Sequence, residues 1–277
     1  MPATRLEPRR VERVWGRADL PDWAPGEADG DTPIGEIWFE EPDGADRALL
    51  IKLLFTADRL SIQVHPDDVA AQAIGHKRGK DEAWLVLDAE PGAVIGLGLT
   101  REVNKAELRE AALSGAIEQL IDWRPVRTGD VFFSPAGTIH AIGAGLTIME
   151  IQQNLNLTYR LYDYGRPREL HLEKAVAAAR PEPWRPAFAQ HSLEPGRGLL
   201  HAGRGFVLER WTGDQSREVR PGGEDLWLIP TRDGGRLDGT PLTVGSVFRV
   251  EGKARLDGDR SLIAAYPGGA KRPDLLA

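Results

Sequence analysis

Short apolar runs separated by turn residues dominate the pattern along the chain. Glycine (31 residues) and proline (20 residues) are spread through the whole sequence and interrupt these runs, as is typical of an all-β protein with many turns. Ten runs are predicted to be strands: residues 48–55, 60–65, 82–87, 131–134, 146–152, 158–162, 206–211, 225–229, 246–250 and 261–266. The pattern therefore predicts a mainly β fold.

Three segments between the strands are predicted to be helices. Residues 67–74 carry acidic residues in the first turn, where a helix N-terminus favours negative charge. A second helix begins at Asn104, with Glu107 in the capping-box position. A third helix covers residues 172–179. The second helix carries an apolar stripe that we expect to face the core: Leu113, Ile117, Leu120 and Ile121.

The chain is predicted to fold as two halves. Four prolines lie between Arg180 and Gly198 and indicate a connector, and a second series of short strands follows. We therefore expect one β-barrel or sandwich over residues 1–190 and another over residues 191–277.

The second half offers little chemistry. Its two histidines, His191 and His201, are isolated in the sequence and are expected to have structural or surface roles. We expect this half to bind no metal, to pack against the first half and to support one rim of its pocket.

Composition and charge exclude several classes of function. A net charge of -7 makes the chain a poor electrostatic partner for nucleic acid or an anionic membrane. Because the sequence has no cysteine, disulfides and thiolate metal sites are excluded, and a metal must use nitrogen or oxygen ligands. No apolar segment suggests a secretory signal or a membrane span, so a cytoplasmic location is predicted.

The clearest chemical motif is a turn followed by a histidine. Residues 129–140 read Gly-x5-Pro-x-Gly-x2-His, which is the spacing of the second sequence motif of cupins. The Pro-x-Gly turn fixes the start of the next strand, so His140 is expected to point into a barrel as a metal ligand.

Partners for His140 are found in two extended segments. Ser61, Gln63 and His65 share one face of a strand because side chains two residues apart point the same way. Lys80 and Glu82 share a face in the next candidate strand. Two imidazoles, one carboxylate and one amide suit Zn²⁺, and also Mn²⁺ or Fe²⁺, so the residues alone leave the metal open.

A fourth segment combines Glu150 with Arg160 ten residues later. The planar guanidinium of an arginine suits a phosphate or an enediolate. Taken alone, the same pair also fits a buried ion pair.

Four stretches resemble type I phosphomannose isomerases, of the short bacterial branch: residues 49–68, 79–84, 135–141 and 158–166. They occur in the order and at the spacing typical of that family, and residues 15–16 and 35–38 resemble its N-terminal signature. The resemblance covers roughly residues 11–175, whereas the C-terminal part resembles the second barrel of the family only loosely.

The resemblance implies two cupin, or jelly-roll, β-barrels with short helices in and after the first. It implies interconversion of mannose 6-phosphate and fructose 6-phosphate by zinc-assisted proton transfer through a cis-enediolate. One zinc per chain would be held by Gln63, His65, Glu82 and His140. The active site would also contain Arg160, Lys80 and Glu150.

Several roles and readings stay open at this level. Lys80 and Glu150 are both candidates for the base, the first because a close metal ion should lower its pKa. Arg160 could bind phosphate or the enediolate, while Ser61 and Lys52 are candidates for substrate contact. The alternatives are an iron-dependent cupin oxygenase and a non-catalytic sugar-phosphate-binding cupin. The partner is expected to be a small sugar phosphate, and the chain a monomer or a homodimer.

Overall fold

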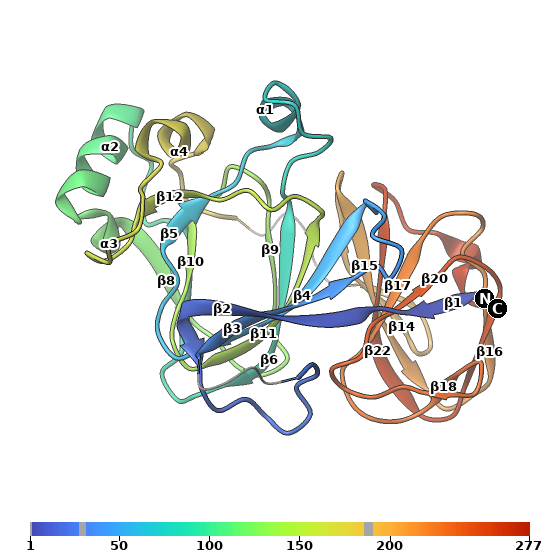
Figure 1. The fold of residues 1–277 in the computed structure, drawn as a ribbon. Helices are drawn as coiled ribbons and strands as arrows, with labels where there is room; N and C mark the ends of the chain where they lie inside the picture. Colours follow the sequence, from blue (N-terminus) through green and yellow to red (C-terminus); the bar gives the residue numbers. More distant parts are fainter. Residues whose placement is uncertain (1, 28–31, 186–190) are drawn as a thin grey trace.

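The computed structural model describes residues 2–27, 32–185 and 191–277. Four antiparallel sheets and a group of helices lie in successive layers (Figure 1). From the helices on the left of Figure 1 towards the chain termini on the right, the sheets have five, six, seven and four strands.

Two of these sheets belong to the first half of the chain. The six-stranded sheet has the order β2 (Glu7–Arg17), β3 (Ile34–Glu40), β4 (Leu49–Thr56), β11 (Leu146–Gln153), β6 (Glu82–Ala89) and β9 (Val131–Ser134). The five-stranded sheet has the order β12 (Tyr159–Tyr162), β5 (Ile62–Val64), β10 (His140–Ile142), β7 (Val94–Leu99) and β8 (Ile121–Pro125).

The other two sheets are formed mainly by the second half. The seven-stranded sheet has the order β1 (Ala3–Arg5), β20 (Phe248–Val250), β17 (Leu226–Pro230), β22 (Arg260–Pro267), β15 (Phe206–Gly213), β14 (Arg197–Ala202) and β13 (His191–Glu194). The four-stranded sheet has the order β16 (Arg217–Val219), β21 (Ala254–Asp257), β18 (Arg236–Leu237) and β19 (Thr240–Pro241).

Strand alternation explains how one sheet separates two cores. On β4, which is buried along its whole length, Leu53 belongs to the core shared with the seven-stranded sheet, including Trp227. The next residue, Leu54, belongs instead to the core shared with the five-stranded sheet, including Ile95. The six-stranded sheet is therefore covered on both faces. The face turned towards the five-stranded sheet, called its inner face below, can carry polar residues only where a cavity or a partner receives them.

Helices cover the outer face of the five-stranded sheet. They are α2 (Lys105–Ser114), α3 (Ile117–Leu120) and α4 (Leu172–Ala178), while α1 (Asp68–Gln72) follows β5 and η1 (Pro273–Leu275) lies near the C-terminus. The side chain of Asn104 accepts a hydrogen bond from the backbone N–H of Glu107 at 2.9 Å, so Asn104 caps α2 as expected.

The apolar stripe predicted for the second helix is partly wrong. That helix ends at Gly115, which has a left-handed φ of 79°, and a separate α3 follows. Leu113 is 60% exposed and does not face the core. Ile121 is buried as expected, but it begins β8 instead of continuing a helix.

The N-terminal strand crosses from one half to the other. Strand β2 pairs with β3 in the first half, whereas β1, only one residue earlier, pairs with β20 through Ala3 and Val250. Strand β1 thus lies with the second half of the chain, on the right of Figure 1. The expected boundary near residue 190 falls on residues 186–190, outside the described residues, and remains a prediction.

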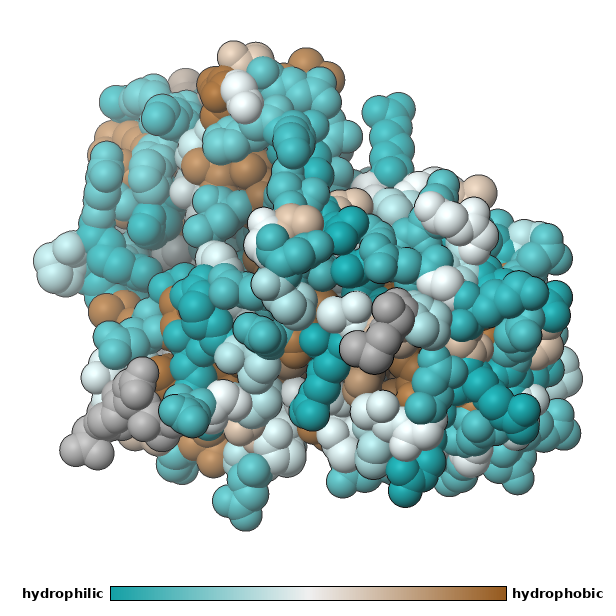
Figure 2. Space-filling model, turned by 45° about the vertical axis from the view of Figure 1, so that its right-hand side comes forward, coloured by the Kyte–Doolittle hydropathy of each residue, from teal (hydrophilic) through white to brown (hydrophobic). Residues whose placement is uncertain are grey.

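The surface agrees with this burial of apolar residues inside the layers. The face in Figure 2 is mainly hydrophilic, with apolar residues in small separate groups. Among the described residues, no helix is long and apolar enough to cross a membrane.

Candidate active site

A cavity of about 560 Å³ opens in the first half of the chain. Six of the residues singled out from the sequence line it: Lys52, Ser61, Gln63, Lys80, Glu150 and Arg160. The other three, His65, Glu82 and His140, are almost completely buried and contact two of these lining residues. The structure therefore brings all nine predicted residues together. All described residues of the cavity lining lie between positions 12 and 171, so the expected contribution of the second half to its rim is not observed.

The two histidines and Glu82 form a compact cluster. Their candidate ligand atoms lie within 4.8 Å of one another. Nε2 of His65 is 3.4 Å, and Nε2 of His140 is 3.1 Å, from Oε1 of Glu82. They come from three places in the chain: the end of β5, the first residue of β6 and the first residue of β10.

The Pro-x-Gly turn connects two of these groups directly. Gly137 adopts a left-handed φ of 86°, which glycine tolerates better than other residues. Its backbone N–H donates to the carbonyl of His65 at 2.9 Å. The turn before His140 is thus hydrogen-bonded to the backbone of His65, and its left-handed φ accounts for the glycine of the motif.

Hydrogen bonds orient both imidazoles towards the carboxylate. Nδ1 of His65 lies 2.9 Å from the carbonyl of Leu157, and Nδ1 of His140 lies 2.9 Å from the carbonyl of Thr138. Because a carbonyl only accepts, each Nδ1 must carry the proton, which leaves the Nε2 lone pairs facing Glu82. This carbonyl-bound tautomer is the usual arrangement of metal-ligating histidines.

The charges around this cluster favour a bound cation. Burial, followed by the nearby positive charge of Lys80, lowers the pKa of His65 to about 3, so its imidazole is neutral. Burial alone would raise the pKa of Glu82, but the positive charge of Lys80 opposes it, and that pKa lies well below its usual value. A carboxylate that faces imidazole lone pairs at 3.1 and 3.4 Å is repulsive unless a cation lies between them, so these residues fit a metal ion.

Gln63 can complete the set through its amide. Nε2 of Gln63 lies 3.2 Å from Nε2 of His140, and its Oε1 accepts from the hydroxyl of Ser61 at 3.1 Å. The opposite orientation of the amide would turn its oxygen towards the cluster and its NH₂ towards the hydroxyl of Ser61, which can also accept. Ser61 therefore supports the amide in either orientation.

Lys80 lies between the cluster and the cavity. Its Nζ is 2.9 Å from Oε2 of Glu82 and 3.1 Å from Nε2 of His65. Burial lowers the pKa of Lys80, but the carboxylates of Glu82 and Glu150 outweigh it, and the pKa is raised above its usual value. The protein groups alone thus raise the pKa of Lys80, whereas a bound metal ion was expected to lower it.

A row of alternating charges crosses the inner face of the six-stranded sheet. Arg13 on β2 donates to Glu36 on β3 at 2.8 Å. Lys52 on β4 lies 3.3 Å from Oε2 of Glu150 on β11, its partner in the strand register. The pKa of Glu150 is raised because its burial outweighs the attraction of Lys80 and Lys52.

Sequence reasoning missed two members of this row, Arg13 and Glu36. Arg13 lies in residues 5–13, where basic and acidic side chains are mixed as in a solvated segment, so its sequence gives no sign of a site. The signal that could have identified Glu36 is its spacing of two from Trp38 in a strand-like run, since both side chains point to the same face.

Arg160 is exceptional among the cations of the cavity. Lys52, Lys80 and Arg13 each face a carboxylate, and Arg168 binds Asp163 through two nitrogens at 2.6 and 2.7 Å. The guanidinium of Arg160 has no hydrogen bond or ion pair with any residue that the structure describes, and burial together with Arg168 lowers its pKa. A cation in this position lacks an anion, and the cavity is where one can bind.

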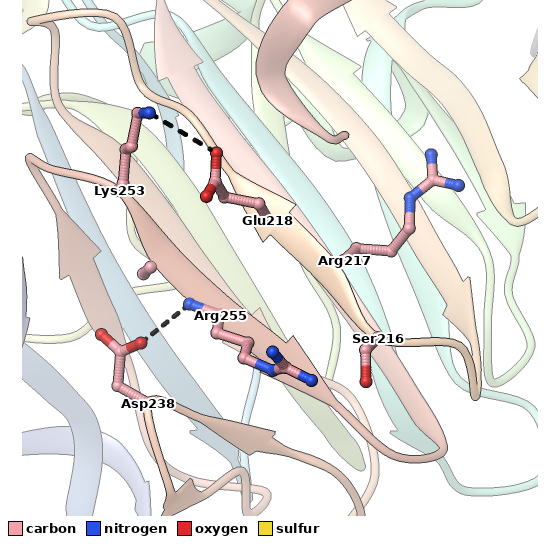
Figure 3. A pocket seen from close by; sticks show the side chains of 7 residues that line it. Ser216, Arg217, Glu218, Asp238, Lys253 and Arg255 are labelled. Carbon is pink, nitrogen blue, oxygen red and sulfur yellow. Dashed lines mark hydrogen bonds and ion pairs between the residues drawn. The ribbon is translucent and has the colours of Figure 1, made fainter.

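A second hollow lies in the other half of the molecule (Figure 3). It measures about 280 Å³, and its charged groups contact one another: Lys253 lies 3.8 Å from Glu218, and the backbone N–H of Arg255 donates to Asp238 at 2.8 Å. Among the described lining residues none is a histidine, which leaves the cavity of the first half as the candidate site.

Comparison with known proteins identifies relatives of one kind. No protein-family model matches the chain. The mannose-6-phosphate isomerase of Streptococcus mutans is 42% identical over 156 residues, which cover 52% of this chain and 49% of that protein. The mannose-6-phosphate isomerase ManA of Bacillus subtilis is 33% identical over 208 residues, which cover 62% of this chain and 66% of that protein. The matches thus span about half to two thirds of the length of these curated relatives.

Solved structures share the fold over almost the whole chain. The crystal structure of the mannose 6-phosphate isomerase from Bacillus subtilis is 27% identical, with a TM-score of 0.83, and the match covers 96% of this chain and 100% of that chain. A mutant of the phosphomannose isomerase from Salmonella typhimurium shows the same fold at 15% identity, with a TM-score of 0.75 and coverage of 97% and 100%. These likenesses confirm the mainly β cupin fold. Together with the sequence relatives, they show that the chain belongs to the type I phosphomannose isomerase family.

Proposed function

We propose that the protein interconverts D-mannose 6-phosphate and D-fructose 6-phosphate. One observation supports this proposal above all: a buried His-Glu-His cluster adjoins a cavity into which Arg160 brings a cation without an acidic partner among the described residues. A phosphorylated sugar supplies the missing anion and places hydroxyl and carbonyl oxygens near the cluster. The names of the relatives point to the same reaction.

The metal in this proposal is one Zn²⁺ per chain. His65, Glu82 and His140 would hold it, with Gln63 as the fourth ligand once its amide oxygen faces the cluster. Four nitrogen and oxygen ligands without thiolate suit zinc. When bound, the ion would supply a positive charge that polarises the sugar oxygens.

The remaining chemistry is a proton transfer between C1 and C2 through a cis-enediolate. We assign the base to Lys80 or Glu150, since both line the cavity. The base removes the proton from C2 of the aldose and returns it to C1, while the hydroxyl proton of O2 passes to O1, and the reverse reaction uses the same group. Arg160 would stabilise the negative oxygens of the enediolate with its planar guanidinium. Ser61 and Lys52 are the proposed substrate contacts.

Two other functions remain to be tested against this one. An iron-dependent oxygenase would use two histidines and one carboxylate, but it would not need the cations that surround this cavity. A non-catalytic sugar-phosphate-binding cupin would need those cations but no base beside the metal. The presence of both Lys80 and Glu150 in the lining favours the isomerase.

A coupled assay with mannose 6-phosphate, on protein whose metal content has been measured, distinguishes the three. We expect turnover by protein that carries one zinc per chain, loss of activity after chelation and recovery with zinc. Stoichiometric iron with oxygen-dependent turnover would instead establish the oxygenase. Zinc-loaded protein that binds mannose 6-phosphate without converting it would establish the binding module.

Other expectations are untouched by the structure. The cytoplasmic location and the choice between monomer and homodimer remain predictions. We also retain the division into a catalytic half, residues 1–190, and a non-metal half, residues 191–277, as a proposal.

A further inference from the structure

The short segment formed by Glu36 and Trp38 on β3 has no role in the chemistry described so far, although both side chains are directed towards the charge row. Oε2 of Glu36 accepts hydrogen bonds from the indole N–H of Trp38 at 2.6 Å and from Arg13 at 2.8 Å. Glu36 is 9% exposed. The indole ring of Trp38 is thus held at its polar edge by a buried carboxylate.

The face of the same ring contacts a candidate substrate-binding residue. Nζ of Lys52 lies 4.6 Å from the ring centroid of Trp38, within the range of a cation–π interaction. The two residues are also direct partners in the register of β3 and β4. On its other side the ammonium of Lys52 lies 3.3 Å from Glu150, so the ring and the carboxylate together fix its position.

Glu150 is in turn fixed on two sides. Its Oε2 faces Lys52, and its Oε1 accepts from the indole N–H of Trp84 at 3.2 Å. Any displacement of Lys52 therefore breaks the ion pair that it forms with Oε2 of Glu150.

We propose that Trp38, oriented by Glu36, is a positioning residue that holds the ammonium of Lys52 against Glu150 at the wall of the cavity. Trp38 is absent from the described lining of the cavity and acts only through Lys52. This inference builds on the proposed isomerase function, because it assigns a task to the surroundings of two residues of that site.

Steady-state kinetics of the zinc-loaded protein with mannose 6-phosphate test the inference. Trp38→Leu removes the ring face and should lower kcat/KM about ten-fold. Lys52→Met should lower the same parameter. Trp38→Phe keeps a ring face but loses the N–H that Glu36 receives, and should lie between wild type and Trp38→Leu. In the Lys52→Met background, Trp38→Leu should have almost no further effect, because the group that it positions is gone. Metal content should stay unchanged throughout.

Trp184→Leu is the matched control. Trp184 also donates its indole N–H, to the carbonyl of Phe133 at 3.0 Å, and also has a cation, Arg124, 5.0 Å from its ring centroid. It lies outside the candidate site, so its replacement should leave kcat/KM unchanged. If Trp38 had a merely structural role, Trp38→Leu would lower kcat/KM by the same factor in wild type and in Lys52→Met. That result would overturn the inference. Equal rates for Trp38→Phe and wild type would overturn the part assigned to Glu36.

A measurement independent of activity separates this inference from the proposed function. In a ¹H–¹³C spectrum of protein with ¹³C-labelled lysine, the ε-CH₂ signal of Lys52, identified by its loss in Lys52→Met, should be shifted upfield by the ring current of Trp38. Trp38→Leu should abolish that shift. A wild-type protein that shows the shift but no turnover contradicts the isomerase function alone, whereas an unshifted signal contradicts the positioning role whether or not the protein is active.

Discussion

At the scale of single residues, charge balance distinguishes the groups of the cavity. Lys52, Lys80 and Arg13 have carboxylate partners, and each pair is nearly neutral as a unit. Arg160 lacks such a partner among the described residues. Since a partly buried cation is stabilised by an anion, Arg160 is the group whose surroundings should change most when a sugar phosphate binds.

Arg160→Lys tests whether the planar guanidinium is needed. Lysine keeps the positive charge but loses the two parallel donors, so we expect kcat to fall about 100-fold or more if Arg160 stabilises the enediolate. If Arg160 binds the phosphate equally in ground and transition states, KM should rise instead while kcat stays similar. Steady-state kinetics distinguish the two roles. Arg109→Lys, at an exposed arginine paired with Glu173, should change neither parameter, and a fully active Arg160→Lys would contradict both roles.

Lys80→Met tests the assignment of the base. If Lys80 transfers the proton, kcat should fall about 100-fold or more, while zinc content measured by atomic spectroscopy should be preserved because Lys80 is not a ligand. Lys77→Met is the control, since Lys77 is an exposed lysine paired with Asp46. A loss of only a few-fold would restrict Lys80 to the ion pair with Glu82 and leave Glu150 as the base.

The sequence predicted the residues of this site better than their interactions. His65, Glu82 and His140 could be identified because strand alternation and a fixed turn spacing are local properties. The row from Arg13 to Glu150 could not, because its members lie on four strands whose order in the sheet, β2-β3-β4-β11, is set by tertiary pairing. The pKa of Lys80 is raised first by Glu82, which is close in sequence, and second by Glu150, whose position depends on that same pairing.

At the scale of secondary structure, the turns position the site more than the strands do. Each of the ten predicted strand segments overlaps a strand of the structure, whereas the second helix was predicted too long because an apolar spacing continues past Gly115 into a strand. Strand β2 escaped prediction because alternate positions carry charged side chains that reach solvent at the edge of the sheet. Local pattern thus located ten strands, whereas β3, β7, β8 and β14 were also not predicted.

Gly137→Ala should show the coupling between the turn and the cluster. An alanine at this left-handed φ is strained by about 1 kcal/mol, and its Cβ would approach the carbonyl oxygen of Ala178 to 3.2 Å. We expect a lower free energy of unfolding and weaker zinc binding, measured by denaturant titration and by competition with a chelator, because the turn bonded to His65 must shift.

Gly129→Ala is the control for backbone strain alone. Gly129 also has a left-handed φ, of 93°, but a Cβ there meets nothing within 4 Å. It should lose similar stability with unchanged zinc affinity. Equal zinc affinities in the two variants would refute the coupling between Gly137 and the cluster.

At the scale of the whole molecule, the two halves share one core. Apolar residues of the six-stranded and seven-stranded sheets pack together in a single cluster. Beside this cluster, the ring of His201 stacks on Phe133 from β9 at a centroid distance of 3.6 Å. It also contacts the ring of Phe206 from β15 at a centroid distance of 5.7 Å. A titratable side chain is therefore buried where the sheets meet.

His201 should make stability depend on pH. Burial lowers its pKa to about 4, compared with about 6.5 in an unfolded chain. Between these values the unfolded chain binds more protons, so the free energy of unfolding should fall as the pH decreases from 6.5 to 4, and His201 adds no further pH dependence below that.

His201→Phe should reduce the loss of stability between pH 7 and pH 4.5 by on the order of 2 kcal/mol, as measured by urea unfolding at both pH values. The ring of phenylalanine retains the stacking but cannot be protonated. Identical pH dependence in wild type and variant would show that His201 does not contribute to the acid sensitivity.

The pairing of β1 with β20 has a consequence for how the protein is made. A ribosome releases the chain from its N-terminus, and residues 3–5 leave it long before residues 248–250, to which they pair. At roughly 5–20 residues per second, the strand waits on the order of ten seconds or more for its partner, while β2 beside it can already pair with β3. Strand β1 is thus paired only after most of the chain has emerged, and nascent chains stalled before residue 248 should hold the first half folded with β1 unpaired and open to a protease.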